Sequence, residues 1–203
     1  MKDYKYYIDS GLLDLYVMGQ TTPEESQAIE QIAVSDPDFR KEISTIERSL
    51  ENYAKIHEVE PNPLIRPFLM ATIDFSDRMQ SGEMLSFPPV LNESSKIDDF
   101  SEWLNREDMI LPEQFDDVYA KILSYSPQII TAIVWIKEMA PQEVHDHEFE
   151  KFLIVEGTCD ITIENSVYQL VPGDYLSIPL YKSHFVTVTS EIPCKVILQR
   201  VAA

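Results

Sequence analysis

The stretch His145-Asp-His147-Glu-Phe-Glu150-Lys-Phe-Leu-Ile-Val-Glu-Gly157 decides the fold of this chain, and Gly173-Asp-Tyr-Leu-Ser-Ile-Pro179-Leu-Tyr-Lys-Ser-His184 completes it. Residues i and i+2 lie on one face of a strand, so His145 and His147 are predicted to point the same way. Glu150 just beyond them and His184 from a later strand can close on the same point. Imidazole and carboxylate are ligands that suit zinc, iron or nickel. We therefore predict one divalent metal ion, bound by His145, His147, Glu150 and His184 inside a small β-barrel.

These residues resemble the cupin family, whose two motifs have the forms G-x5-H-x-H-x3–4-E-x6-G and G-x5-P-x-G-x2-H. Three departures stand out: the gap from His147 to Glu150 is one residue short, the opening glycine is missing, and Tyr181 replaces the inner glycine of the second motif. The short gap leaves Glu148 open as the alternative carboxylate. Glu150 is favoured because a strand then runs unbroken from it to the turn at Gly157. The other alternative is a barrel that has lost its metal.

Composition restricts the class of protein. The chain has 203 residues and a net charge of −19, which argues against direct binding to nucleic acid or to anionic membranes and suits a basic protein partner. The sequence contains no apolar run of 18 or more residues, so no transmembrane helix is predicted. The N-terminus lacks the apolar core of a signal peptide, so we expect a cytoplasmic protein.

The two halves of the chain differ in hydrophobic period. Thr22-Pro23-Glu24-Glu25 predicts a capped helix start, and Asp36 before Pro37 predicts another. From about residue 115 the period changes to two, with short apolar runs between turns. We predict an α+β chain with a helical bundle over residues 1–80, a linker over 81–110 and a jelly-roll β-barrel over 111–203.

The helical half resembles the anti-sigma domain. The resemblance rests on Leu13-Asp-Leu-Tyr-Val-Met-Gly19, Thr22-Pro-Glu-Glu-x3-Ile-Glu and Asp36-Pro-Asp-Phe-Arg-x-Glu, and it covers residues 5–55 clearly and 64–80 weakly. The His-x3-Cys-x2-Cys signature of the zinc-type members is absent. The resemblance implies no catalytic residue in the helical half. It implies that the helices clamp an extracytoplasmic-function (ECF) sigma factor.

The order of the two domains resembles that of ChrR-like anti-sigma factors. This resemblance implies a cytoplasmic regulator whose helices hold an ECF sigma factor inactive while the cupin senses a small-molecule or oxidant signal at its metal. The alternative is a metal-dependent enzyme of the dioxygenase, isomerase or lyase type, since such a site leaves coordination positions open. A binding protein for a small molecule is a third candidate. We favour the regulator because a small cupin enzyme has no need of the N-terminal helices.

Overall fold

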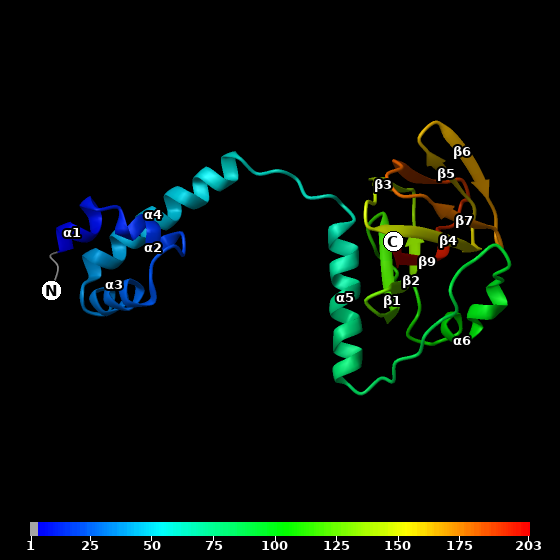
Figure 1. Ribbon diagram of the computed structural model, residues 1–203, viewed down its shortest axis with the longest axis horizontal. Coiled ribbons are helices and arrows are strands. Elements are labelled where there is room, and N and C mark those ends of the chain that lie inside the picture. Colours follow the sequence, from blue (N-terminus) through cyan, green and yellow to red (C-terminus); the bar gives the residue numbers. More distant parts are fainter. Residues whose placement is uncertain (1–3) are drawn as a thin grey trace. The chain divides into compact units, whose positions relative to one another are not determined.

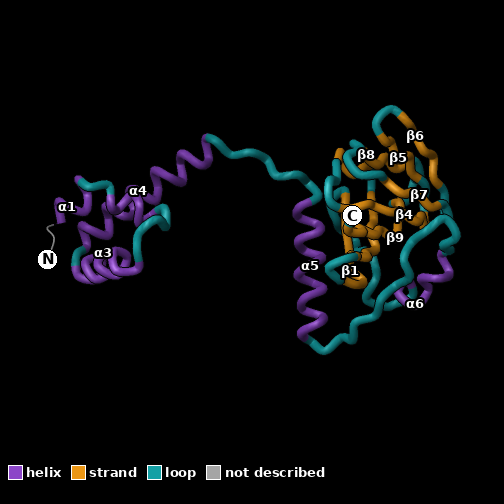
Figure 2. Tube along the Cα trace, viewed as in Figure 1, coloured by secondary structure: helices purple, strands orange, loops and turns teal. Residues whose placement is uncertain are grey.

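The computed structural model describes residues 4–203 and divides the chain into two compact units, with the boundary between Glu60 and Pro61. Residues 1–3, with which the expected helical domain and the N-terminus expected to lack a signal peptide begin, lie outside the described residues. Helices form the first unit and strands most of the second (Figures 1 and 2). The predicted α+β class is confirmed. Within residues 4–203, no helix is both long and apolar enough to cross a membrane.

The N-terminal unit consists of α1 (Tyr4–Asp9), α2 (Leu12–Val17), α3 (Pro23–Ser35) and α4 (Pro37–Ile56). Its helix starts follow the predicted caps. Thr22 Oγ1 accepts the N–H of Glu25 at 3.2 Å, and the Glu25 carboxylate accepts the N–H of Thr22 at 3.0 Å, which completes a capping box. Asp36 Oδ1 accepts the N–H groups of residues 38 and 39 at the start of α4. The small core is formed by Tyr7, Leu12, Leu13, Ile29, Phe39 and Ile43.

The C-terminal unit contains two antiparallel sheets that face each other. One has the order β1-β2-β9-β4-β7 and the other the order β3-β8-β5-β6. The strands are β1 (Val118–Tyr125), β2 (Ile129–Ile136), β3 (Met139–Glu143), β4 (Glu148–Glu156), β5 (Cys159–Ile163), β6 (Ser166–Leu170), β7 (Tyr175–Ile178), β8 (His184–Val188) and β9 (Cys194–Ala202). The predicted turn at Gly157 joins β4 to β5. Its φ is 70°, and a Cβ there would lie 2.9 Å from the backbone oxygen of Pro193, so only glycine fits.

The five-stranded sheet is covered on both faces. Its inner face packs into the barrel core with Ile122, Ala132 and Leu198, while the alternate residues Ile133 and Ile197 pack into a second core on the outer face. This explains why β2 reads as a continuous apolar run and not as an alternating one. Both cysteines of the chain, Cys159 and Cys194, are buried and free in the inner core.

Residues 81–110 were expected to be a linker, but they cover the outer face of this sheet. Leu91 and Phe100 are fully buried there, with Trp103 of the short helix α6 (Ser101–Leu104), which follows a 3-10 turn at Ile97–Phe100. The buried side chain of Gln199 fixes this segment, because it accepts the N–H of Leu91 at 2.7 Å and donates to the backbone oxygen of Pro89 at 2.8 Å. The boundary between the two units lies at residues 60–61, so residues 81–110 belong to the C-terminal unit and do not link the two units.

Helix α5 (Ile65–Gln80) also differs from the expected domain boundary at residue 80. It lies alongside β1 (Figure 1) and buries Ala71 and Phe75 in the barrel core, so it is part of the C-terminal unit. Residues 64–80 were expected to belong to the helical bundle, and they are helical as expected. An amphipathic helix does not identify the surface that covers its apolar face, because a helical bundle and a sheet bury the same apolar stripe.

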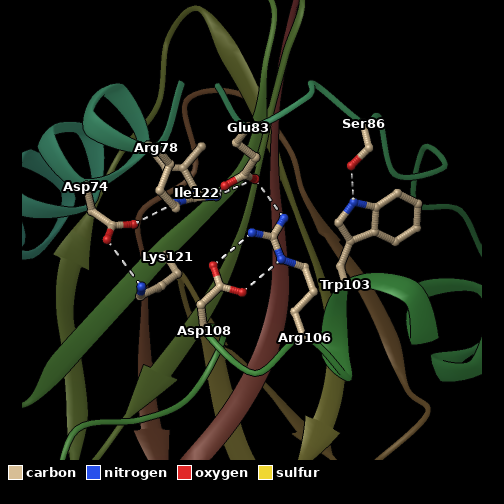
Figure 3. Close-up of polar contacts among 9 residues, drawn as sticks. All are labelled: Asp74, Arg78, Glu83, Ser86, Trp103, Arg106, Asp108, Lys121 and Ile122. Atoms are coloured by element: carbon tan, nitrogen blue, oxygen red, sulfur yellow. Dashed lines mark hydrogen bonds and ion pairs between the residues drawn. The ribbon is translucent and has the colours of Figure 1, made fainter. Parts of the chain in front are cut away.

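A network of ion pairs ties the C-terminal end of α5 to the barrel (Figure 3). Arg78 contacts Asp74 at 3.0 Å and Glu83 at 2.7 Å, and it donates to the backbone oxygen of Ile122 in β1. Glu83 also accepts from Arg106 at 2.7 Å. These groups are partly buried, so their hydrogen bonds contribute more than those of exposed pairs.

We expect Glu83→Gln to lower the free energy of unfolding of the C-terminal unit by about 1–2 kcal/mol at pH 7, because two guanidinium groups lose a charged acceptor. Hydrogen bonds from Arg106 hold the pKa of Glu83 below its ordinary value, although partial burial opposes this. A lowered pKa in the folded state gives stability that is complete above the ordinary pKa and is lost as the pH falls through the lowered one. The difference between variant and wild type should therefore shrink in acid.

Urea unfolding at neutral and acid pH measures this difference. Tryptophan fluorescence reports on the C-terminal unit alone, since Trp103 and Trp135 are the two tryptophans of the chain. Glu113→Gln, a matched change at an exposed position of the same unit, should leave stability within about 0.5 kcal/mol of wild type. A Glu83→Gln variant as stable as the control would show that the network does not anchor α5.

Candidate metal centre

Two cross-strand pairs from the facing sheets build the site. Glu143 of β3 lies opposite His184 of β8 in one sheet, and Glu150 of β4 lies opposite Arg200 of β9 in the other. Residues paired across a ladder share a face, so both pairs direct side chains into the space between the sheets. His145 adds a fifth side chain from the connection between β3 and β4.

Four of these side chains offer ligand atoms that lie within 4.8 Å of one another: Glu143, His145, Glu150 and His184. Glu150 is at the centre, with Oε2 2.9 Å from His184 Nε2 and 3.5 Å from His145 Nε2. His145 Nε2 is also 3.9 Å from Glu143 Oε2. Ligands bonded to one metal at about 2.0–2.2 Å lie roughly 3–4 Å apart, so a small contraction brings all four to bonding distance.

The hydrogen bonds of the two histidines also fit a metal ion. Among the described residues, His145 Nε2 is a buried side-chain atom with no hydrogen-bond partner, and such an atom is costly to leave unsatisfied. His184 Nδ1 faces the backbone oxygen of Lys182 at 3.3 Å, and its Nε2 is directed at Glu150 Oε2 at 2.9 Å. In the tautomer whose Nδ1 donates to that backbone oxygen, Nε2 is free to bind a metal. A cation between these acceptor atoms would satisfy them all. The residues present therefore fit a divalent metal.

Two carboxylates of the cluster, Glu143 and Glu150, pair with one guanidinium, that of Arg200. Burial alone would raise the pKa of Glu150, but the imidazoles of His145 and His184 and the charge of Arg200 hold it well below its ordinary value. Burial raises the pKa of Glu143, against the charge of Arg200. The nearby Glu150 carboxylate raises the pKa of His145, although burial opposes this. Glu150 is thus a carboxylate ready to bind a cation.

His147, which the sequence placed among the metal ligands, lies outside the cluster. Its side chain is 90% exposed and is 3.4 Å from Asp146. The expectation that His145 and His147 share a strand face is not met, because both precede β4 and a bend at residues 146–147 separates their directions. Glu148, the alternative carboxylate, is partly exposed and lies 3.7 Å from His145 Nδ1 and 3.4 Å from Arg200 Nε, at the edge of the site.

Glu143 takes the fourth place in the cluster and was not among the predicted metal ligands. It stands two residues before His145, and the same i, i+2 spacing that drew attention to His147 would have pointed to it.

Tyr181, in the place of the family's second-motif glycine, has a φ of 61° and donates its N–H to the backbone oxygen of His145 at 2.8 Å. Its side chain is exposed, so it fills neither the pocket nor the barrel.

Residues 132–199 match the family model of the cupin domain. The C-terminal unit contains a cupin domain. The match spans β2 to β9 and includes His145, Glu150 and His184. Comparison with curated proteins gave no match.

Several solved structures resemble the cupin domain at a distance. A predicted oxalate decarboxylase from Thermotoga maritima is 16% identical with a TM-score of 0.44, over 48% of this chain and 97% of that one. A cupin superfamily protein from Desulfitobacterium hafniense is 19% identical with a TM-score of 0.41, over 46% and 84%. KdgF from a Halomonas species is 16% identical with a TM-score of 0.42, over 47% and 92%. These similarities are too remote to indicate an activity.

We expect the His145→Ala variant to lose bound metal and the His147→Ala variant to keep it, because of these two histidines His145 alone directs a ring nitrogen into the cluster. Elemental analysis of the two purified proteins, each compared with wild type, measures metal per chain. Metal retained by His145→Ala but lost from His147→Ala would place the ligands on the exposed side of the bend.

Proposed function

We propose that this protein is a cytoplasmic anti-sigma factor: its N-terminal helices hold an ECF sigma factor, and its cupin domain binds one divalent metal ion at which a chemical signal acts. Helix α4 carries the observation that favours a protein partner. Its apolar stripe begins in the core at Phe39 and Ile43, which are 0% and 8% exposed. The same stripe continues to Leu50 and Tyr53, which are 36% and 65% exposed.

An apolar helix face that leaves its own core and remains exposed is typical of a protein interface. Ile56 extends the exposed part by one turn, with 79% of its surface open. Two further features support a sigma factor as the partner. The residues of the N-terminal unit resemble the anti-sigma domain, and the net charge of −19 suits a partner whose DNA-binding surface is basic.

The cupin domain supplies the second half of the proposal. Glu143, His145, Glu150 and His184 would hold the metal, and the ion would provide open coordination positions for a small molecule or an oxidant. His184 is positioned by Lys182, and Arg200 orients both carboxylates. Beside them lies a cavity of about 30 Å³ with largely apolar walls, which has room for about one or two water molecules. A small ligand could approach the metal there.

Co-expression of the full chain with each ECF sigma factor of the same genome tests the proposal. We expect one sigma factor to co-purify with the chain, and the purified chain to inhibit transcription by RNA polymerase loaded with that sigma factor in a reconstituted assay. A metal-dependent enzyme is the second candidate, favoured by the donor cluster beside a cavity. Turnover of a small substrate by purified protein that binds no sigma factor would replace the first candidate with the second.

A further inference from the structure

Arg200 lies between the metal-ligand cluster and helix α5. Its Nε is 3.0 Å from Glu150 Oε1, and a terminal nitrogen is 3.2 Å from Glu143 Oε2. The carbon of the same guanidinium lies 4.7 Å from the centre of the Phe68 ring, which belongs to α5. One side chain, only 20% exposed, therefore contacts two candidate metal ligands and a helix that contributes no ligand.

The two ends of α5 are held differently. Its C-terminal end is fixed to β1, because Arg78 donates to the backbone oxygen of Ile122 and Asp74 pairs with Lys121 at 3.2 Å. Near its N-terminal end, Leu64 and Phe68 line the cavity beside Glu150 and His184. The chain arrives from the N-terminal unit at this end, so a change in the packing of Phe68 acts where the two units are connected.

The guanidinium and a divalent metal require the same carboxylates. Ligation by Glu143 and Glu150 withdraws the negative charge that holds Arg200, and the metal repels the guanidinium at short range. A second cavity, of about 120 Å³ and lined by Phe68, Leu198 and Arg200, gives the displaced side chain room to move. Movement of the guanidinium into this space would change its contact with the Phe68 ring.

We propose that Arg200 competes with the metal ion for Glu143 and Glu150 and, through Phe68, couples metal occupancy to the docking of the N-terminal end of α5. The inference rests on the metal site of the proposed function and specifies how that site is regulated. Without metal, the two carboxylates hold Arg200 against Phe68 and the first turns of α5 are docked. Metal binding releases Arg200 and loosens these turns.

Linkage makes the coupling reciprocal: if metal weakens the contact between Arg200 and Phe68, loss of that contact strengthens metal binding. Zinc titration of wild type, Arg200→Gln, Phe68→Ala and the double variant measures the effect. We expect zinc affinity to rise about tenfold in Arg200→Gln and about threefold in Phe68→Ala, the latter from the strength of a partly buried cation–π contact. Phe68→Ala should add no further increase in the Arg200→Gln background.

Leu69→Ala is the matched control, since Leu69 is the next residue of α5 and is 55% exposed. It should bind zinc as wild type does. Hydrogen exchange of the wild-type protein provides a second measurement that needs no variant. Amides in the first turns of α5 should exchange faster with zinc than without, while those near Arg78 remain unchanged.

Unchanged or weaker zinc affinity in Phe68→Ala, or equal exchange of α5 with and without zinc, would overturn the coupling. Equal or weaker affinity in a folded Arg200→Gln would overturn the competition. If wild type binds zinc and these effects are absent, the metal site stands and this inference falls. If wild type binds no divalent metal, both the metal site and this inference fall, and the sigma-factor experiment then decides separately whether the N-terminal helices bind a sigma factor.

Discussion

Replacing Glu150 with glutamine should abolish high-affinity zinc binding. Glu150 is 2% exposed, and its Oε2 lies within 3.5 Å of a ring nitrogen of both His145 and His184. Removal of a ligand should cost at least about a hundredfold in affinity, since residues that merely orient a ligand already cost about 10–100-fold. Isothermal titration with zinc measures the loss.

The same substitution should destabilise the cupin domain by roughly 3 kcal/mol without metal, because it leaves the largely buried guanidinium of Arg200 without its closest charged acceptor. Urea unfolding followed by the fluorescence of Trp103 and Trp135 reports this loss. Glutamine keeps the volume of the side chain, so a cavity does not contribute.

Glu148→Gln is the matched control for both measurements. It makes the same change of charge on the same strand, at a side chain that is 32% exposed and at the edge of the site. We expect zinc binding to be retained and stability to change by less than about 1 kcal/mol. Loss of zinc from Glu148→Gln with retention in Glu150→Gln would instead assign the ligand to Glu148, the alternative that the short spacing after His147 left open.

Sequence patterns predicted features that depend on local physics. Thr22 and Asp36 cap helices because their side chains reach backbone N–H groups two or three residues away, and no distant contact is needed. Gly157 fits a left-handed turn for an equally local reason. Glu150 and His184 were assigned from the cupin-like spacing, and the structure brings them to 2.9 Å.

Features that depend on tertiary packing were not predictable in the same way. The bend before β4 separates His147 from His145, and no period in the sequence records it. Leu91 and Trp103 pack on the outer face of a sheet from an irregular segment, so their spacing lacks the helical or strand period that would have marked them as core. Arg200 enters the site only because β9 pairs with β4 in a register that places it opposite Glu150.

The double variant Tyr53→Ala/Ile56→Ala should weaken binding of the sigma factor by about a hundredfold, since two large apolar side chains at the centre of an interface each contribute about 1–2 kcal/mol or more. These residues are exposed beyond the core of the N-terminal unit, so the fold should tolerate their removal. Affinity of the full chain for the co-purified sigma factor, measured by biolayer interferometry, reports the loss.

Val167→Ala/Tyr168→Ala removes the same kinds of side chain from the cupin domain, at positions that are 58% and 43% exposed on β6. It should bind the sigma factor as wild type does. Equal weakening by both double variants would indicate a general effect of surface apolar area and not an interface on α4. Weakening by the β6 variant alone would move the partner's binding surface to the cupin domain. Selective loss at Tyr53 and Ile56 has one physical explanation: the apolar stripe that starts in the core of the N-terminal unit continues in the core of a complex.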